Sequence, residues 1–234
     1  MAALDAARLH GRVVVGVTGP GGGLDPRAPA SIRDAVPEDY EAFAQFFAEL
    51  HAPEPLPSAR IYEEHLVQRA FIGVESGAPS AFACWRPEGA AALHVSMVAV
   101  LPERRRRGLG RQMMLEAARR GRAYGLIRWQ LNVAVENAAA QALYEQLGMA
   151  LAFENVLFEV DSALAIRLSS MGSRAAKVRI VGRFGEPPPE VRDDGSRVRV
   201  VVSDDAALVE ELGAAGGVVL HRTFRMSGEI PELP

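Results

Sequence analysis

The sequence predicts a mixed α/β or α+β domain, in which a mostly antiparallel central sheet is flanked by helices. Three strand-like runs in series, residues 70–76, 79–87 and 91–100, are separated by short glycine-containing turns, and this favours two consecutive hairpins. Residues 108–124 then carry apolar side chains on one stripe, which is the pattern of an amphipathic helix. Antiparallel hairpins combined with crossover helices indicate a layered domain that ends near Asp161.

The remaining elements of this domain follow from periodicity and from helix-stop signals. A short strand at Ser31 leads into a helix that begins near Pro37, with Phe43 and Phe47 on one apolar stripe. A proline-rich loop, residues 51–60, precedes a second helix. Beyond Pro102, which closes the third strand of the hairpins, we expect a strand at 126–135, a helix at 137–147 that Gly148 stops, and a strand at 150–160.

The chain divides into three predicted parts. Residues 1–30 are rich in glycine, alanine and proline and are expected to be a flexible leader. Residues 31–161 form the main domain. Residues 162–234 are expected to be a small C-terminal α/β lobe, in which LVEELG at Leu208 echoes LYEQLG at Leu143. The echo suggests a decayed partial repeat of the main domain's second half.

Composition and charge exclude several classes of protein. A formal net charge of -3 and a pI near 6.0 provide no overall field that would gather polyanions. No apolar stretch approaches the roughly 18 residues of a membrane span, and we read no signal peptide. Cys84 is the only cysteine and lies in an apolar run, so an inert thiol in the reducing cytoplasm is expected. The glycine-rich VVVGVTGPGGGLDP lacks the Lys-Ser/Thr of a nucleotide-binding P-loop.

Residues 103–114, ERRRRGLGRQMM, set four arginines and two glycines at a predicted strand-to-helix junction. Backbone N–H groups in the first turn of a helix lack intrahelical partners, and the helix dipole adds about half a positive charge there. Gly108 and Gly110 would let the main chain close around an anion. The stretch therefore predicts a pyrophosphate cradle. A solvated charge run is the structural alternative, and a nucleic-acid patch would need more clustered basic and aromatic residues, so we expect no nucleic-acid partner.

This stretch and a second block carry a family resemblance. The first block, VAVLPERRRRGLGRQMM, contains Arg/Gln-x-x-Gly-x-Gly/Ala as Arg105, Gly108 and Gly110. The second, LNVAVENAAAQALYEQLGM, contains Asn-x-x-Ala-x-x-x-Tyr as Asn137, Ala140 and Tyr144, with Met149 where phenylalanine is usual. Over about residues 31–161, the chain resembles the GNAT superfamily of acetyl-coenzyme A dependent N-acetyltransferases, which implies a GNAT-like sheet.

The resemblance implies a binding site for acetyl-coenzyme A as acyl donor, with no metal. The loop before the helix would bind the pyrophosphate mainly through main-chain N–H groups. The preceding strand would offer its edge to the pantetheine arm where the sheet splays, and one of its amides would stabilise the oxyanion. Asn137 would hydrogen-bond the pantetheine or the following loop, beside Ala140. The implied strand and loop residues are Val98, Ala99, Val100, Arg105, Arg106, Arg107, Gly108, Leu109, Gly110 and Arg111.

Tyr144 is the foremost candidate for chemistry. In the family, a tyrosine at this helix position lies near the thioester sulfur and protonates the departing thiolate. The structural alternative is a tyrosine that buries its ring and leaves its hydroxyl at the surface.

His94 is the candidate general base, because an acceptor amine with a lysine-like pKa of about 10.4 must lose a proton before attack. It precedes Arg105 by eleven residues and shares strand parity with Ser96, Val98 and Val100. A hydrogen-bonded histidine on a half-buried strand is the alternative. In the branch of the family that acetylates ribosomal-protein N-termini, the base is a glutamate five residues before the asparagine. Here that position is Asn132, an amide that cannot accept the proton.

Two functions remain open at this stage. The first is an N-acetyltransferase that transfers acetyl directly, in a ternary complex, to a primary amine of a small molecule or peptide. The second is a non-catalytic acyl-coenzyme A sensor or interaction module. The C-terminal lobe could extend the sheet, cover the acceptor cleft or form a homodimer contact, and the sequence does not choose among these roles.

Overall fold

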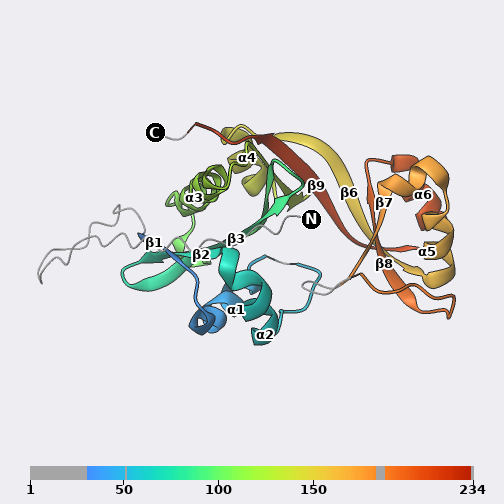
Figure 1. Cartoon of the computed structure of the whole chain (residues 1–234), viewed down its shortest axis with the longest axis horizontal. Helices are drawn as coiled ribbons and strands as arrows, with labels where there is room; N and C mark the ends of the chain where they lie inside the picture. Colours follow the sequence, from blue (N-terminus) through green and yellow to red (C-terminus); the bar gives the residue numbers. More distant parts are fainter. Residues whose placement is uncertain (1–30, 51, 183–187, 233–234) are drawn as a thin grey trace, which may run out of the picture.

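Nine strands form one continuous sheet in the computed structural model, which describes residues 31–50, 52–182 and 188–232. The strand order is β1-β2-β3-β4-β5-β9-β6-β8-β7, and every neighbouring pair is antiparallel except β4 with β5. The predicted fold class, a mostly antiparallel sheet flanked by helices, is therefore confirmed (Figure 1). The expected leader, residues 1–30, and its glycine-rich run lie outside the described residues.

The first half of the sheet matches the predicted hairpins. Its strands are β1 (Ser31–Asp34), β2 (Ala70–Glu75), β3 (Ala78–Glu88), β4 (Ala92–Val100) and β5 (Arg128–Ala134). The turns between β2 and β3 and between β3 and β4 contain Gly77 and Gly89, which have positive φ angles of 80° and 65°. Glycine adopts this left-handed conformation without a steric cost, so the predicted turns close the two hairpins.

Helices cover both faces of this half-sheet. On one face lie α1 (Tyr40–Ala48) and α2 (Ala59–Ile61), the latter continuing as irregular helical turns to Arg69. On the other face lie α3 (Leu109–Ala123) and α4 (Ala138–Gln146) (Figure 1). The apolar stripe of α3 is buried as predicted, with Met113 and Met114 fully enclosed. Two separate apolar clusters result, one on each side of the sheet.

The C-terminal part of the chain completes the same sheet. Its elements are β6 (Ala150–Asp161), α5 (Ser162–Ser169), β7 (Val178–Val181), β8 (Arg197–Ser203), α6 (Ala206–Ala214) and β9 (Val218–Glu229). The sequence did not predict α5. The last strand, β9, lies between β5 and β6 and pairs with both. The expected boundary after Asp161 therefore cuts through a continuous sheet. We propose that residues 162–217 are an insertion between two strands of one domain.

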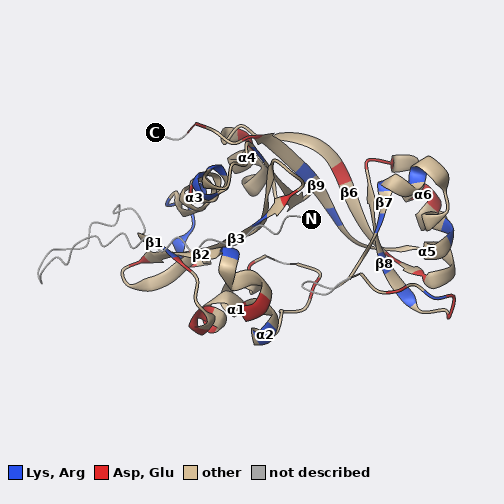
Figure 2. Ribbon diagram, viewed as in Figure 1, with Lys and Arg blue, Asp and Glu red and all other residues tan. Residues whose placement is uncertain are grey.

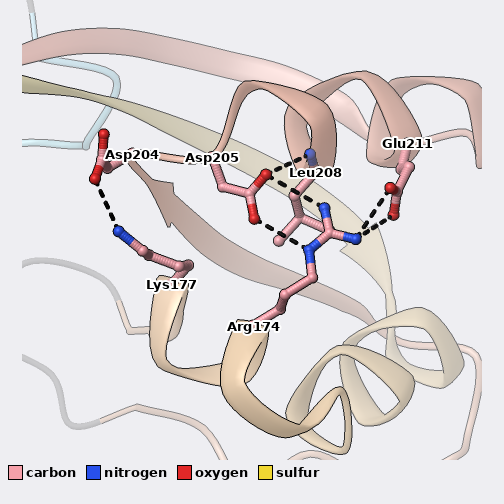
Figure 3. Close-up of polar contacts among 6 residues, drawn as sticks. All are labelled: Arg174, Lys177, Asp204, Asp205, Leu208 and Glu211. Carbon is pink, nitrogen blue, oxygen red and sulfur yellow. Dashed lines mark hydrogen bonds and ion pairs between the residues drawn. The ribbon is translucent and has the colours of Figure 1, made fainter.

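The proposed insertion shares a packed apolar core with β6 and contains ion pairs and hydrogen bonds of its own. Helices α5 and α6 pack an apolar cluster against β6 and β8, at the far right of Figure 1. Figure 3 shows the guanidinium of Arg174 contacting both Asp205 and Glu211, while Asp205 also accepts a hydrogen bond from the Leu208 amide at 2.9 Å. Asp205 thus caps the start of α6, because it satisfies a first-turn N–H group that has no partner within the helix.

Figure 2 shows acidic and basic residues interspersed over the helices and the long strands β6 and β9. None of the helices among the described residues is both long and apolar enough to cross a membrane.

The position of β9 leaves no room for a side chain at Gly228, which can be tested by substitution. A Cβ atom added there would lie 2.5 Å from the carbonyl oxygen of Gly148. We expect Gly228→Ala to lower the free energy of unfolding by about 1–3 kcal/mol, because the backbone behind it has to shift. Gly213→Ala in α6 is the matched control, since a Cβ there would meet nothing within 4 Å. It should raise stability by about 0.4–1 kcal/mol in urea denaturation. Equal effects of the two substitutions would contradict this placement of β9.

Candidate active site

The parallel strands β4 and β5 pair along part of their length and then separate. Residues Ala92–Val95 pair with Arg128–Leu131, and no pairing joins the strands beyond Val95 and Leu131. Strand β5 continues against β9 as far as Ala134, while the last residues of β4 continue against β3. The edge of β4 that faces β5 therefore has no strand partner over residues 96–100. A cavity of about 700 Å³ opens at this split.

A β-bulge at Ser96 decides which side chains face the two sides of the split. Trp85 pairs with Val95 and Cys84 pairs with Met97, so Ser96 is an extra residue on β4. Such a residue reverses the alternation of side chains beyond it. Val98 and Val100 therefore pack on the α3 side, against the same cluster as Leu93 and Val95, whereas Met97 and Ala99 belong to the cluster on the α1 side.

The arginine-glycine loop forms a second cavity of about 430 Å³ beside the first. Gly108 precedes α3 in the left-handed region, with a φ of 83°, and Arg106 has a φ of 62°. The first hydrogen bond within the helix runs from the Gln112 amide to the Gly108 carbonyl at 3.0 Å. The amides of residues 109–111 therefore precede the helical ladder and are available to an anion.

Two arginine side chains of the loop, Arg104 and Arg105, turn toward the protein. The guanidinium of Arg105 donates to the Val100 carbonyl at 3.0 Å and pairs with Glu49, and Arg104 pairs with Glu75 at 3.7 Å. Arg107 lines neither cavity, in contrast to the other implied loop residues Arg105, Arg106, Gly108, Leu109, Gly110 and Arg111. An anion in this loop would therefore meet the main-chain amides together with the side chains of Arg106 and Arg111, which line the smaller cavity.

Gly110 serves packing rather than backbone freedom. It lies inside the first turn of α3 and has no positive φ, unlike Gly108. A Cβ at this position would lie 3.3 Å from Leu143 Cδ2 on α4. Of the two glycines, only Gly108 thus adopts the left-handed conformation, while the missing Cβ at Gly110, which lines the smaller cavity, leaves room beside Leu143.

Tyr144 lies where the two cavities meet. It lines both of them, is 9% exposed and projects from α4. Burial raises the pKa of the Tyr144 hydroxyl to about 12. Among the described residues no group hydrogen-bonds this hydroxyl. The phenol therefore remains protonated at neutral pH and can donate its proton to a group in the cavity.

The family model for GNAT acetyltransferases matches residues 33–149. The chain belongs to the GNAT acetyltransferase family. A GCN5-related N-acetyltransferase from Sphaerobacter thermophilus is 17% identical, with a TM-score of 0.63 over 90% of this chain and 98% of the other. The ribosomal-protein-S18-alanine N-acetyltransferase of Escherichia coli is 19% identical, with a TM-score of 0.48 over 87% of this chain and 96% of that one. At these identities the likeness concerns the fold. A search of curated proteins found no match.

Asn137 is the N-cap residue of α4 in this GNAT domain. Its side chain accepts a hydrogen bond from the Ala140 amide at 3.1 Å and so caps α4. The capping bond satisfies a first-turn donor and fixes where the helix begins, two turns ahead of Tyr144. Asn137 lines the larger cavity and Ala140 the smaller. A residue that the resemblance implies as a ligand of the pantetheine thus also fixes the start of the helix that carries Tyr144.

His94 lines neither cavity, although the next two residues of β4 line the larger one. The Ser96 bulge places it on the opposite face of the sheet from Val98 and Val100, so the expected shared parity is wrong. It is 7% exposed, and its Nδ1 lies 3.0 Å from Glu88 Oε2 and 3.5 Å from an Arg225 nitrogen. Burial lowers the pKa of His94 despite the carboxylate. The geometry fits the alternative interpretation, a hydrogen-bonded histidine on a half-buried strand.

Several cavity residues were not found from the sequence. His221 and Thr223 reach the 700 Å³ cavity from β9, and Glu54 reaches it from the loop after α1. The alternation of polar His221, Thr223 and Arg225 with apolar Phe224 and Met226 was visible and indicates one polar strand face. This alternation, however, does not predict which strands pair with β9. The described residues hold no group of three or more histidine, cysteine or acidic side chains arranged for a metal.

The Glu88–His94 contact predicts a pH dependence of stability. The hydrogen bond from His94 lowers the pKa of Glu88 to about 2. An unfolded chain takes up this proton near pH 4.5, so the contribution is present above pH 4.5 and is lost as the pH falls toward 2. Glu88→Gln should therefore unfold more readily at pH 7 and show a shallower decline between pH 4.5 and 2. Glu190→Gln is the control, because that carboxylate is 78% exposed. An unchanged slope in Glu88→Gln would contradict the pairing.

Proposed function

We propose that the protein transfers an acetyl group from acetyl-coenzyme A directly to a primary amine, with both substrates bound at once. The observation that carries this proposal is the split between β4 and β5. Through it one cavity reaches Val98, Val100 and Tyr144 on the α3 side and Met97, Asn132 and His221 on the α1 side. A donor and an acceptor can therefore meet from opposite faces of the sheet.

The donor would occupy the α3 side. Its pyrophosphate would accept hydrogen bonds from the amides that open α3, where the helix dipole also favours negative charge. Its pantetheine arm would lie along the free edge of β4 at residues 98–100, in the place of a missing strand. The smaller cavity contains Val98, Gly108 and Tyr144 together, which supports a ligand that extends from the loop to the catalytic helix.

The chemistry needs two proton movements and one stabilised charge. The acceptor nitrogen attacks the thioester carbonyl, and an amide on the free edge of β4 would stabilise the resulting oxyanion. Tyr144 would protonate the departing thiolate. Its burial and its raised pKa support this role, since the hydroxyl carries its proton throughout the neutral range.

Tyr144→Phe removes the proposed acid and keeps the ring. We expect turnover to fall about 100-fold, while the affinity for acetyl-coenzyme A stays within a few-fold of wild type, because the ring still fills the site. Thiol release measured against peptides, spermidine, kanamycin and lysine would identify the acceptor and give this ratio. Unchanged turnover would remove Tyr144 from the mechanism. Thermal stabilisation by acetyl-coenzyme A without thiol release from any amine would favour the non-catalytic sensor.

Gly108→Glu tests the anion site. The new carboxylate would enter the cradle, so binding of acetyl-coenzyme A should fall below detection in calorimetry. Gly125→Glu is the matched control, because Gly125 has a similar φ of 77° against 83° and equally open surroundings but lies outside both cavities. Both variants carry the same backbone strain. Equal losses of affinity in the two would show that strain, rather than the anion site, is responsible.

A further inference from the structure

Strand β9 supplies a polar wall to the α1 side of the cavity. Thr223 pairs with Ala134 on β5 and with Asn155 on β6, so these residues share one face of the sheet. The neighbouring residues Phe224 and Met226 belong to the apolar cluster on the opposite face. The wall thus consists of side chains from three strands, and its cavity-lining members are Asn132, Thr223 and His221.

A second β-bulge precedes His221. Leu157 of β6 pairs with His221 and Phe158 pairs with Val219, so Leu220 is an extra residue on β9. A bulge bends its strand and re-aims the side chains beside it. Because His221 alternates with Thr223, its imidazole lies on the polar face, and it lines the cavity that also contains Tyr144.

Asn132 is held in place by its neighbours and cannot serve as the base. Its Oδ1 accepts a hydrogen bond from Asn155 Nδ2 at 3.2 Å, and Asn155 Oδ1 in turn accepts one from the Ser203 hydroxyl at 2.6 Å. This chain fixes the orientation of the Asn132 amide. A proton acceptor for the amine therefore has to come from another strand or from the loop after α1.

Several other charged side chains around the cavity are in ion pairs. Glu49 pairs with Arg105, and Glu54 Oε1 pairs with Arg199 at 2.5 Å, while the buried Oε2 of Glu54 has no hydrogen-bond partner among the described residues. On β6, Glu159 shares the polar face and pairs with Arg197 at 3.2 Å. The remaining ionisable groups that line the cavity are Glu136, Arg106, Tyr144 and His221. Within the described residues, no hydrogen bond or ion pair engages the His221 ring.

We propose that His221 is the general base that takes the proton from the acceptor amine. This inference rests on the proposed acetyl transfer. An imidazole titrates nearer to neutral pH than a carboxylate does, so His221 is a better matched proton acceptor than Glu136 or the free Oε2 of Glu54. The position on β9 lets it face the acceptor while Tyr144 faces the donor.

The proton balance of the step is complete. The ammonium of the acceptor gives one proton to the imidazole of His221, and the freed lone pair forms the C–N bond with the acetyl carbon. The C–S bond then breaks, and the thiolate takes the proton of Tyr144. The second proton of the new amide nitrogen returns to Tyr144, and His221 releases its proton to solvent through the open cavity.

The test compares histidine variants in steady-state assays over a pH series. His221→Gln should lower kcat about 100-fold near pH 7 with no change in the dissociation constant of acetyl-coenzyme A. The deficit should shrink as the pH approaches 10, because a lysine-like amine then loses its proton unaided. His65→Gln is the matched control, since His65 is 54% exposed and lies outside both cavities. Added imidazole should restore turnover to His221→Ala, which a purely structural role would not allow.

Three outcomes would overturn the assignment. The first is a His221→Gln enzyme with wild-type turnover and pH profile. The second is a loss that appears in His94→Gln or Glu136→Gln but not in His221→Gln. In both cases the wild-type enzyme still releases thiol, so acetyl transfer itself stands. The third is a wild-type protein that releases no thiol with any amine of the panel, which rejects the proposed function together with the role of His221.

Discussion

The separation of β4 from β5 after four paired residues is the constraint on which the rest of the site depends. Two parallel strands that stayed paired would satisfy each other's amides and close the sheet. Here the edge of β5 that faces β4 has no strand partner beyond Leu131, while its other edge pairs with β9 along its whole length, and β4 has a bulge at Ser96. Backbone amides on the free edge of β4 lower the stability of the fold unless water or a ligand hydrogen-bonds to them. An extended ligand could satisfy these amides as a neighbouring strand would. The same gap joins the two faces of the sheet, so the proposed donor and acceptor would need no shared entrance.

The C-terminal strand β9 forms part of the site around this split. Strand β9 is inserted beside β5 from more than eighty residues further along the chain, and it brings His221 and Thr223 to the cavity. The insertion also reaches the other wall, since Arg199 of β8 pairs with Glu54 in the loop after α1. Removing residues 162–217 would therefore remove the Arg199–Glu54 pair and the Ser203 hydrogen bond to Asn155, while the loop that opens α3 would keep its local geometry.

Local sequence patterns predicted most of the helices and strands. The features that were not predicted depend on pairing between strands that are distant in the sequence. The hairpins, the stripe on α3 and the Tyr144 helix follow from turn residues and periodicity, which depend on neighbours in the chain. The Ser96 bulge could not be predicted from the sequence. A single extra residue in a strand reverses which side chains face each side of the sheet, but it leaves the composition of the strand unchanged. For that reason His94 was expected beside Val98 and lies on the opposite face. The place of β9 depends on which strands leave an open edge, and its own sequence does not contain that information.

The central claim is that a coenzyme occupies the free edge of β4 and the start of α3. Amide hydrogen exchange with and without acetyl-coenzyme A tests this most directly, because it reads the backbone groups that the account assigns to the ligand. We expect slower exchange at residues 96–100 and 106–111, and no change at residues 197–214 in the insertion. Protection confined to the insertion, or absent from both segments at saturating acetyl-coenzyme A, would contradict the account.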